Sequence, residues 1–170
     1  MRVLLQRVLR AEVTVGGLSC GKIGAGLLAL VGVGEGDGPD DAAWCARKML
    51  NLRLHSDAGS GKQWSASVGS RGLGLLLVSQ FTLHASCRKT KPSFSRALGG
   101  DEARALFDEV VRLCREAKNV DVQTGQFGAM MEVGLVNDGP VTVWLDSKNR
   151  NDLAWGAAVG ADDAGGDGDE

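Results

Sequence analysis

The sequence has no tyrosine, only two histidines and only four cysteines. The cysteines are far apart and never form a C-x-x-C pair, so we expect four free thiols in a reducing compartment. They are Cys20, Cys45, Cys87 and Cys114. The histidines, His55 and His84, lack partners at metal-ligand spacing. We therefore expect no metal site and no cofactor.

The sequence also lacks the G-x-S-x-G segment that presents a nucleophilic serine on a sharp turn. Neither histidine lies near an obvious nucleophile in the sequence, and a hydroxyl nucleophile needs an adjacent base. These absences argue against a hydrolase of the Ser-His-Asp type. If the protein cleaves an ester, positioning and backbone N–H groups must supply most of the catalysis.

No segment approaches the roughly 20 consecutive apolar residues that cross a bilayer. The first residues include Arg2, Gln6 and Arg7, which interrupt any signal-peptide core. We expect no membrane contact and a cytoplasmic location.

The net charge of −2 is unevenly distributed. Five of the 21 acidic residues, and no basic one, lie among the last fifteen residues. The rest of the chain therefore carries 19 basic residues against 16 acidic ones. A mildly basic domain is compatible with a nucleic-acid substrate without requiring one.

Apolar periodicity predicts one α/β domain with helices packed on a mixed, barrel-like sheet. Proline and acidic residues together in a first turn predict a helix from about residue 39, and a second helix is expected over 101–118. Residues 57–72, rich in Gly and Ser, predict a loop or hairpin. The expected strands are 2–8, 11–15, 27–33, 73–78, 119–123, 129–136 and 141–146. The domain is predicted to span 1–147, followed by a disordered Gly/Asp-rich acidic tail over 148–170.

Two segments place polar groups at the ends of buried strands. The first is Ser79-Gln80-Phe81-Thr82. Hydroxyls, an amide and free backbone N–H groups at a sheet edge can bind a carbonyl oxygen as it becomes negative. The alternative is a strand end whose hydroxyls only cap a turn.

The second segment is Asn137-Asp138-Gly139-Pro140-Val141-Thr142. Its turn chemistry alone predicts a hairpin between the strands expected at 129–136 and 141–146. Gly139-Pro140 can also hold a cis peptide, which is a minority state of X–Pro bonds.

Together these motifs resemble the two signatures of the D-aminoacyl-tRNA deacylase family. The resemblance covers about residues 1–146, and further fragments carry it in the same order: Gln6-Arg7-Val8, Gly24-Ala25-Gly26-Leu27-Leu28, Lys91-Pro92-Ser93-Phe94 and Thr124-Gly125-Gln126-Phe127. Gln63-Trp64 and the acidic tail depart from the family pattern.

The resemblance implies a homodimeric hydrolase that cleaves the ester of D-aminoacyl-tRNA, and also glycyl-tRNA. Gly139-Pro140 would be a cis peptide that enters the partner's active site beside Ser79, Gln80, Phe81 and Thr82. Its carbonyls would exclude an L-side chain, and Arg7 would hold the loop in place. Either Thr82 is the nucleophile, or water attacks with help from the terminal ribose hydroxyl. The missing base favours water.

For tRNA, Phe81 and Phe127 are candidates for stacking on the terminal base, with an ordinary core role as the alternative for each. The densest basic stretch, Arg88, Lys89, Lys91 and Arg96, is expected to meet phosphates, or else to be a solvated loop.

Three rival functions stay open. One is a related deacylase for mischarged L-alanyl-tRNA with a trans Gly-Pro. Another is a non-catalytic nucleic-acid-binding module, for example for DNA. The last is a structural dimer without a ligand.

Overall fold

The computed structural model describes residues 1–150. Its elements follow the chain as β1 (Arg2–Val15), β2 (Leu18–Ile23), β3 (Gly26–Gly32), α1 (Pro39–Asn51), α2 (Val68–Arg71), β4 (Gly74–Ser79), the 3₁₀ helix η1 (Phe81–His84), α3 (Gly100–Arg115), β5 (Asp121–Thr124) and β6 (Glu132–Asp146). The last twenty residues of the predicted tail, 151–170, lie outside the described part.

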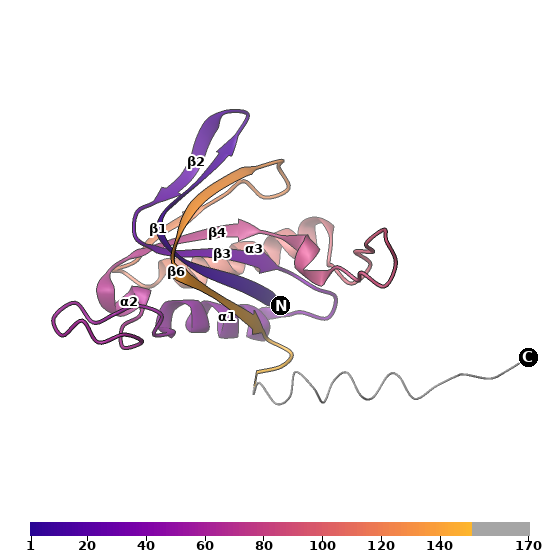
Figure 1. The fold of residues 1–170 in the computed structure, drawn as a ribbon. Coiled ribbons are helices and arrows are strands. Elements are labelled where there is room, and N and C mark those ends of the chain that lie inside the picture. The colour runs from indigo at the N-terminus through magenta and orange to yellow at the C-terminus, as the bar shows by residue number, and fades with distance from the viewer. Residues whose placement is uncertain (151–170) are drawn as a thin grey trace, which may run out of the picture.

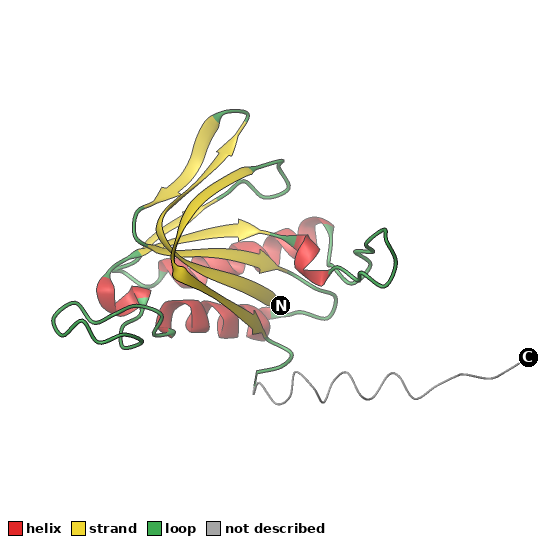
Figure 2. Ribbon diagram, in the orientation of Figure 1, coloured by secondary structure: helices red, strands yellow, loops and turns green. Residues whose placement is uncertain are grey.

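The six strands form one sheet with β1 at its centre (Figures 1 and 2). The mixed character of the sheet was predicted, whereas strand β2 was not. β3 pairs with the first half of β1 and β2 with its second half, both antiparallel to it. β6 is also antiparallel to β1 and pairs with it from Arg2, opposite Asp146, to Thr14, opposite Glu132. Strands β3, β4 and β5 run parallel to each other. A strand with three partners places residues from both ends of the domain side by side.

The sheet curls until β2 approaches β5, which gives the barrel-like shape that the sequence predicts. The contact is so close at Gly21 that a Cβ there would lie 2.4 Å from the carbonyl oxygen of Thr124. A side chain at this position would push the two strands apart.

Two hydrophobic clusters stabilise the curled sheet. Alternate residues of β4 serve different clusters: Leu75 and Leu77 face the helices, whereas Leu76 and Val78 face the inside of the curl. Helices α1 and α3 pack side by side on the first of these faces (Figure 1). Burial on both faces explains why this strand is an uninterrupted apolar run.

Both predicted helices are present, with α1 starting at Pro39 and α3 at Gly100. The short helix α2 lies at the end of the segment predicted as a loop or hairpin. None of the described helices has the length and apolar character needed to span a membrane.

The strand predictions at both ends of the domain need correction. Residues 2–8 and 11–15 belong to one continuous strand, β1, and residues 132–146 form one strand, β6, instead of the hairpin expected at Asn137. No hairpin forms at Asn137 because the chain pairs with β1 both before and after this segment, and so continues in one direction. The Asn-Asp-Gly-Pro segment instead forms a bulge within β6.

The predicted tail begins with three described residues that contact the domain. Lys148 Nζ donates to Asp41 at 2.7 Å, and Arg150 Nη2 donates to the same carboxylate at 3.3 Å. Asp41 also accepts a hydrogen bond from the Gly38 N–H at 3.0 Å, so one buried carboxylate joins the start of α1 to the chain after β6.

Candidate active site

The Ser79-Gln80-Phe81-Thr82 motif lies where β4 ends. The Gln80 N–H still donates to the carbonyl of Val31 on β3, at 2.8 Å, and the chain then turns into η1. Polar residues therefore follow directly after a fully buried strand, at the carboxyl edge of the parallel part of the sheet. This is the edge at which α/β sheets commonly bind ligands.

The backbone N–H groups of Phe81 and Thr82 find no acceptor within residues 1–150. They open η1, and the first N–H groups of any helix lack a partner inside it. The Thr82 hydroxyl accepts a hydrogen bond from Gln80 Nε2 at 2.5 Å. The motif thus offers two free N–H donors beside the Thr82 hydroxyl. The hydrogen-bond partner of that hydroxyl is the Gln80 amide, which cannot act as a base.

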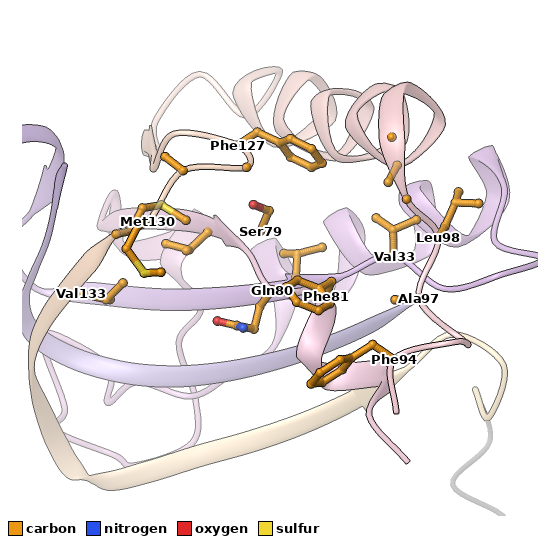
Figure 3. A pocket seen from close by; sticks show the side chains of 18 residues that line it. Val33, Ser79, Gln80, Phe81, Phe94, Ala97, Leu98, Phe127, Met130 and Val133 are labelled. Carbon is orange, nitrogen blue, oxygen red and sulfur yellow. The ribbon is translucent and has the colours of Figure 1, made fainter. Parts of the chain in front are cut away.

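A cavity of about 610 Å³ opens beside this motif. Ser79, Gln80 and Phe81 form part of its wall, and Figure 3 shows Ser79 between Gln80 and Phe127. The remaining wall is mainly apolar and comes from the end of β3 and the residue after it, the segment before α3 with the first turns of that helix, and the start of β6 with the segment before it. It includes Val33, Leu98, Ala103, Met130 and Val133. An apolar cavity with polar groups on one side can hold an organic ligand in one orientation.

Aromatic rings stand on both sides of the cavity. Phe81 and Phe94 pack edge to face with centroids 5.0 Å apart, and 53% of Phe81 is exposed. Phe127 is half-buried against Phe107, at 5.7 Å, and lies under the guanidinium of Arg104. Phe81 is therefore free to stack on a ligand, whereas Phe127 has part of its surface committed to the core.

The histidines are not placed to act as bases on Thr82. The ring of His84 is buried and its Nε2 lies 3.1 Å from the carbonyl oxygen of Gly32. His55 is buried beside Arg7, and its Nε2 has no hydrogen-bond partner in the described chain. Burial lowers the pKa of both rings, and for His55 the Arg7 charge lowers it further. Across residues 1–150 no group of three His, Cys, Asp or Glu side chains is arranged to hold a metal ion.

The Gly139–Pro140 motif forms a bulge, and its peptide bond is cis. Thr142 and Asn137 of β6 pair with Gln6 and Val8 of β1, so the intervening residues 138–141 stand opposite Arg7 alone. Asn137 closes the bulge because its Oδ1 accepts a hydrogen bond from the Val141 N–H at 2.8 Å. Gly139 has φ 142°, which L-residues rarely adopt.

Arg7 lies behind this bulge. Its Nε donates to the Asp138 carbonyl at 3.0 Å, and its Nη1 donates to the Leu54 carbonyl at 2.6 Å. The same Nε forms an ion pair with the Asp138 carboxylate at 3.1 Å. Arg7 therefore connects the bulge to the segment that follows α1.

Within the described chain the two motifs do not share a cavity. Gly139 and Pro140 are exposed, and none of residues 138–141 lines the cavity beside Ser79. One copy of the protein thus presents a polar cavity edge at one place and a projecting Gly-Pro bulge at another.

The predicted phosphate-binding residues are all exposed: Arg88, Lys89, Lys91 and Arg96. They lie on the connection between η1 and α3, where Ser86 and Ser93 exchange backbone hydrogen bonds. This connection also carries Phe94 to the cavity wall. The connection between η1 and α3 therefore carries both the basic side chains and part of the cavity wall.

Sequence reasoning missed much of the cavity wall. Leu98, Ala103, Met130 and Val133 carry no chemical signal, and they meet only because the fold brings their segments together. The proximity of His55 and Trp64 to Arg7 was also missed, because the sequence marked His55 only as a histidine without metal-ligand partners and Gln63-Trp64 only as a departure from the family pattern.

A curled mixed sheet with two helices on one face defines an α/β architecture that solved structures share. A chain titled "c-Myc DNA Unwinding Element Binding Protein" superposes with a TM-score of 0.80 at 38% identity, covering 86% of this chain and 98% of that one. A second, titled a probable eukaryotic D-amino acid tRNA deacylase, shares the fold with a TM-score of 0.72 at 16% identity, covering 85% and 97%.

Residues 4–146 match the family described as D-Tyr-tRNA(Tyr) deacylase, and the chain belongs to this family. A Chromobacterium violaceum protein named D-aminoacyl-tRNA deacylase is 53% identical over 150 residues, covering 88% of this chain and 99% of that protein. A Dehalococcoides mccartyi protein of the same name is 49% identical, covering 88% and 97%. The family membership expected from the short motifs is confirmed.

Proposed function

We propose that this protein hydrolyses the ester that joins a D-amino acid to the 3′ end of tRNA. The observation that carries the proposal is the cavity edge at the end of β4, where two N–H groups without an acceptor in residues 1–150 lie beside polar side chains. Family membership and the names of its relatives supply the substrate class. A cytoplasmic location is part of this proposal and follows from the proposed substrate.

Water is the nucleophile in this proposal. Its oxygen attacks the ester carbonyl, and the N–H groups of Phe81 and Thr82 bind the oxygen that becomes negative. The carbon–oxygen bond to the ribose then breaks, the ribose oxygen takes up the proton that the attacking water loses, and a free amino acid and tRNA are released. Thr82 positions the reactants, because its hydroxyl is hydrogen-bonded to Gln80 and neither His55 nor His84 reaches it.

Chirality is read by the Gly139–Pro140 bulge of a second copy. Gly139 and Pro140 are exposed and do not line the cavity beside Ser79 of their own chain, so the bulge is free to enter the site of a partner. There it would occupy the space of an L-side chain and leave room for a D-side chain. Glycine has no side chain to be excluded, so glycyl-tRNA would also be accepted. This arrangement requires a homodimer.

The tRNA would lie across the connection between η1 and α3. The exposed Phe81 is suited to stack on the terminal base, and aromatic stacking contributes about 1–3 kcal/mol per base. Lys89 and Lys91 would meet phosphates of the acceptor stem.

A second candidate function is binding of DNA without catalysis. The solved relative whose title names a DNA unwinding element favours it, as do the exposed cations. A binding module would leave the lifetime of aminoacyl-tRNA unchanged at any protein concentration.

The deciding experiment compares hydrolysis of D-tyrosyl-tRNA, L-tyrosyl-tRNA and L-alanyl-tRNA at catalytic protein concentration. Rapid loss of the D-ester with both L-esters spared is the expected result. Hydrolysis of L-alanyl-tRNA alone would indicate the rival deacylase. If all three esters survive while a DNA duplex binds, the hydrolase proposal is wrong.

A further inference from the structure

Trp64 has a backbone conformation that its residue type disfavours. Its φ is 59°, and it is the one non-glycine residue among 1–150 with a positive φ. For a bulky L-residue this left-handed region is an outlier that surrounding structure must hold. The side chain is 55% exposed, so burial does not supply that hold.

The segment that carries Trp64 forms several hydrogen bonds of its own. The Asp57 carboxylate accepts from the N–H groups of Gly59 and Ser60, at 3.1 and 2.8 Å. At the base of the segment, His55 and Ala66 exchange backbone hydrogen bonds of 2.9 and 3.0 Å. These hydrogen bonds fix the backbone of the loop on either side of Trp64.

The loop directs the Trp64 ring toward Arg7. The guanidinium carbon of Arg7 lies 5.8 Å from the ring centroid, within the range of a cation–π contact. Arg7 is the side chain that donates to the Asp138 carbonyl, and Gly139 lies so near that a Cβ there would be 3.4 Å from Arg7 Nη2. One guanidinium thus contacts the bulge and the tryptophan.

We propose that Trp64 is a positioning residue that sets chiral selectivity. By restricting the Arg7 guanidinium, the ring fixes how far Gly139 and Pro140 project toward the substrate. Trp64 itself touches no reacting atom. The inference rests on the proposed function, and it adds a residue outside both signature motifs.

The chain offers a matched control for this contact. Trp144 lies 5.7 Å from the guanidinium of Arg2, which is on the same strand as Arg7. Arg2 donates to Asp146 and to the Leu83 carbonyl, and no hydrogen bond within residues 1–150 joins it to the bulge. Trp144→Ala therefore removes the same kind of interaction without affecting Gly139 and Pro140.

The test measures kcat/KM for D-tyrosyl-tRNA and L-tyrosyl-tRNA with wild type, Trp64→Ala, Trp64→Phe and Trp144→Ala. For Trp64→Ala we expect the ratio of D to L hydrolysis to fall about fivefold, mainly because L hydrolysis rises. Trp64→Phe retains a ring and should recover most of the ratio. Trp144→Ala should match wild type.

Trp64→Gly separates positioning from folding. Glycine adopts φ 59° readily, so this variant should keep or raise the Tm while losing selectivity. A selective wild type with unchanged selectivity in both Trp64→Ala and Trp64→Gly overturns the inference and leaves the proposed function intact. A wild type that hydrolyses neither ester, or both equally, overturns the proposed function itself.

Discussion

Arg7 and Asp138 are joined twice, once through the backbone and once through the side chain. Arg7 Nε donates to the Asp138 carbonyl oxygen at 3.0 Å and lies 3.1 Å from the Asp138 carboxylate. Because the Asp138 carbonyl accepts from the Arg7 side chain, it is not paired with a backbone N–H of β1 as it would be in a regular ladder. The arginine therefore stabilises the bulge itself, and with it the projection of the next two residues.

Gly139→Ala should disturb this bulge. A Cβ at residue 139 would lie 2.7 Å from Val141, and φ 142° is unfavourable for alanine. We expect a loss of about 1–3 kcal/mol in the free energy of unfolding, measured by urea denaturation, and reduced D-over-L selectivity. Gly134→Ala is the control on the same strand, because its nearest neighbour would be 4.0 Å away. Equal stability of the two variants would show that residue 139 needs no special conformation.

Thr82→Ala separates the two possible nucleophiles. Because the Thr82 hydroxyl is hydrogen-bonded to Gln80 and no histidine reaches it, we expect D-ester hydrolysis to fall by no more than about tenfold, or about 1.4 kcal/mol of activation free energy. Single-turnover deacylation measures this directly. Complete loss of hydrolysis, with an unchanged circular dichroism spectrum, would instead support an acyl-threonine intermediate.

Binding of tRNA should weaken steeply with salt. Each phosphate contact contributes about 0.9 to the slope of log K against log salt concentration on duplex nucleic acid. Replacing the exposed Lys89 and Lys91 by Ala should therefore reduce the slope by about 2 in a filter-binding titration. Lys118→Ala, also exposed but beyond the far end of α3, serves as the control. An unchanged slope in the double variant would make the connection a solvated loop.

We expect the contact between Asp41 and the chain after β6 to be sensitive to acid. Burial alone would raise the pKa of Asp41, but hydrogen bonds from Lys148, Ser147 and the Gly38 N–H outweigh burial and hold the pKa well below its ordinary value. A pKa depressed by folding stabilises the protein above the unfolded-state value of about 3.9, and this stability is lost as pH falls further.

Asp41→Asn should therefore cost about 1–3 kcal/mol at pH 7, and the difference from wild type should shrink below about pH 4. Thermal unfolding over pH 3–7 measures it. Asp40→Asn, on the exposed side of the same turn, should change little. A pH-independent difference would mean that packing, and not charge, explains the effect of the Asp41 substitution.

The sequence predicts the interior of this fold better than its edges. The apolar run of β4 indicates burial on both faces, and the two clusters on either side of it confirm that prediction. The hairpin predicted at Asn137 was wrong because turn propensity is local, whereas pairing with β1 is a contact between distant segments.

The candidate site shows the same division. A polar stretch directly after a buried strand indicates a site, and Ser79 and Gln80, named on this ground, lie in the cavity wall. The opposite wall of the cavity was not predictable, because Leu98 and Met130 are ordinary apolar residues until the fold brings them there. The contact between Trp64 and Arg7 was equally unpredictable, since it depends on a left-handed backbone at one residue.

The pairing of β1 with β6 also constrains how the protein is synthesised. Val3 lies opposite Leu145, so β1 pairs with β6, which is synthesised after all the other described strands of the domain. During translation one edge of β1 stays open until β6 emerges, and the loop to be closed spans almost the entire domain. We therefore expect the sheet to be completed only after β6 has been made, with an exposed β1 edge as the aggregation-prone stage of biogenesis.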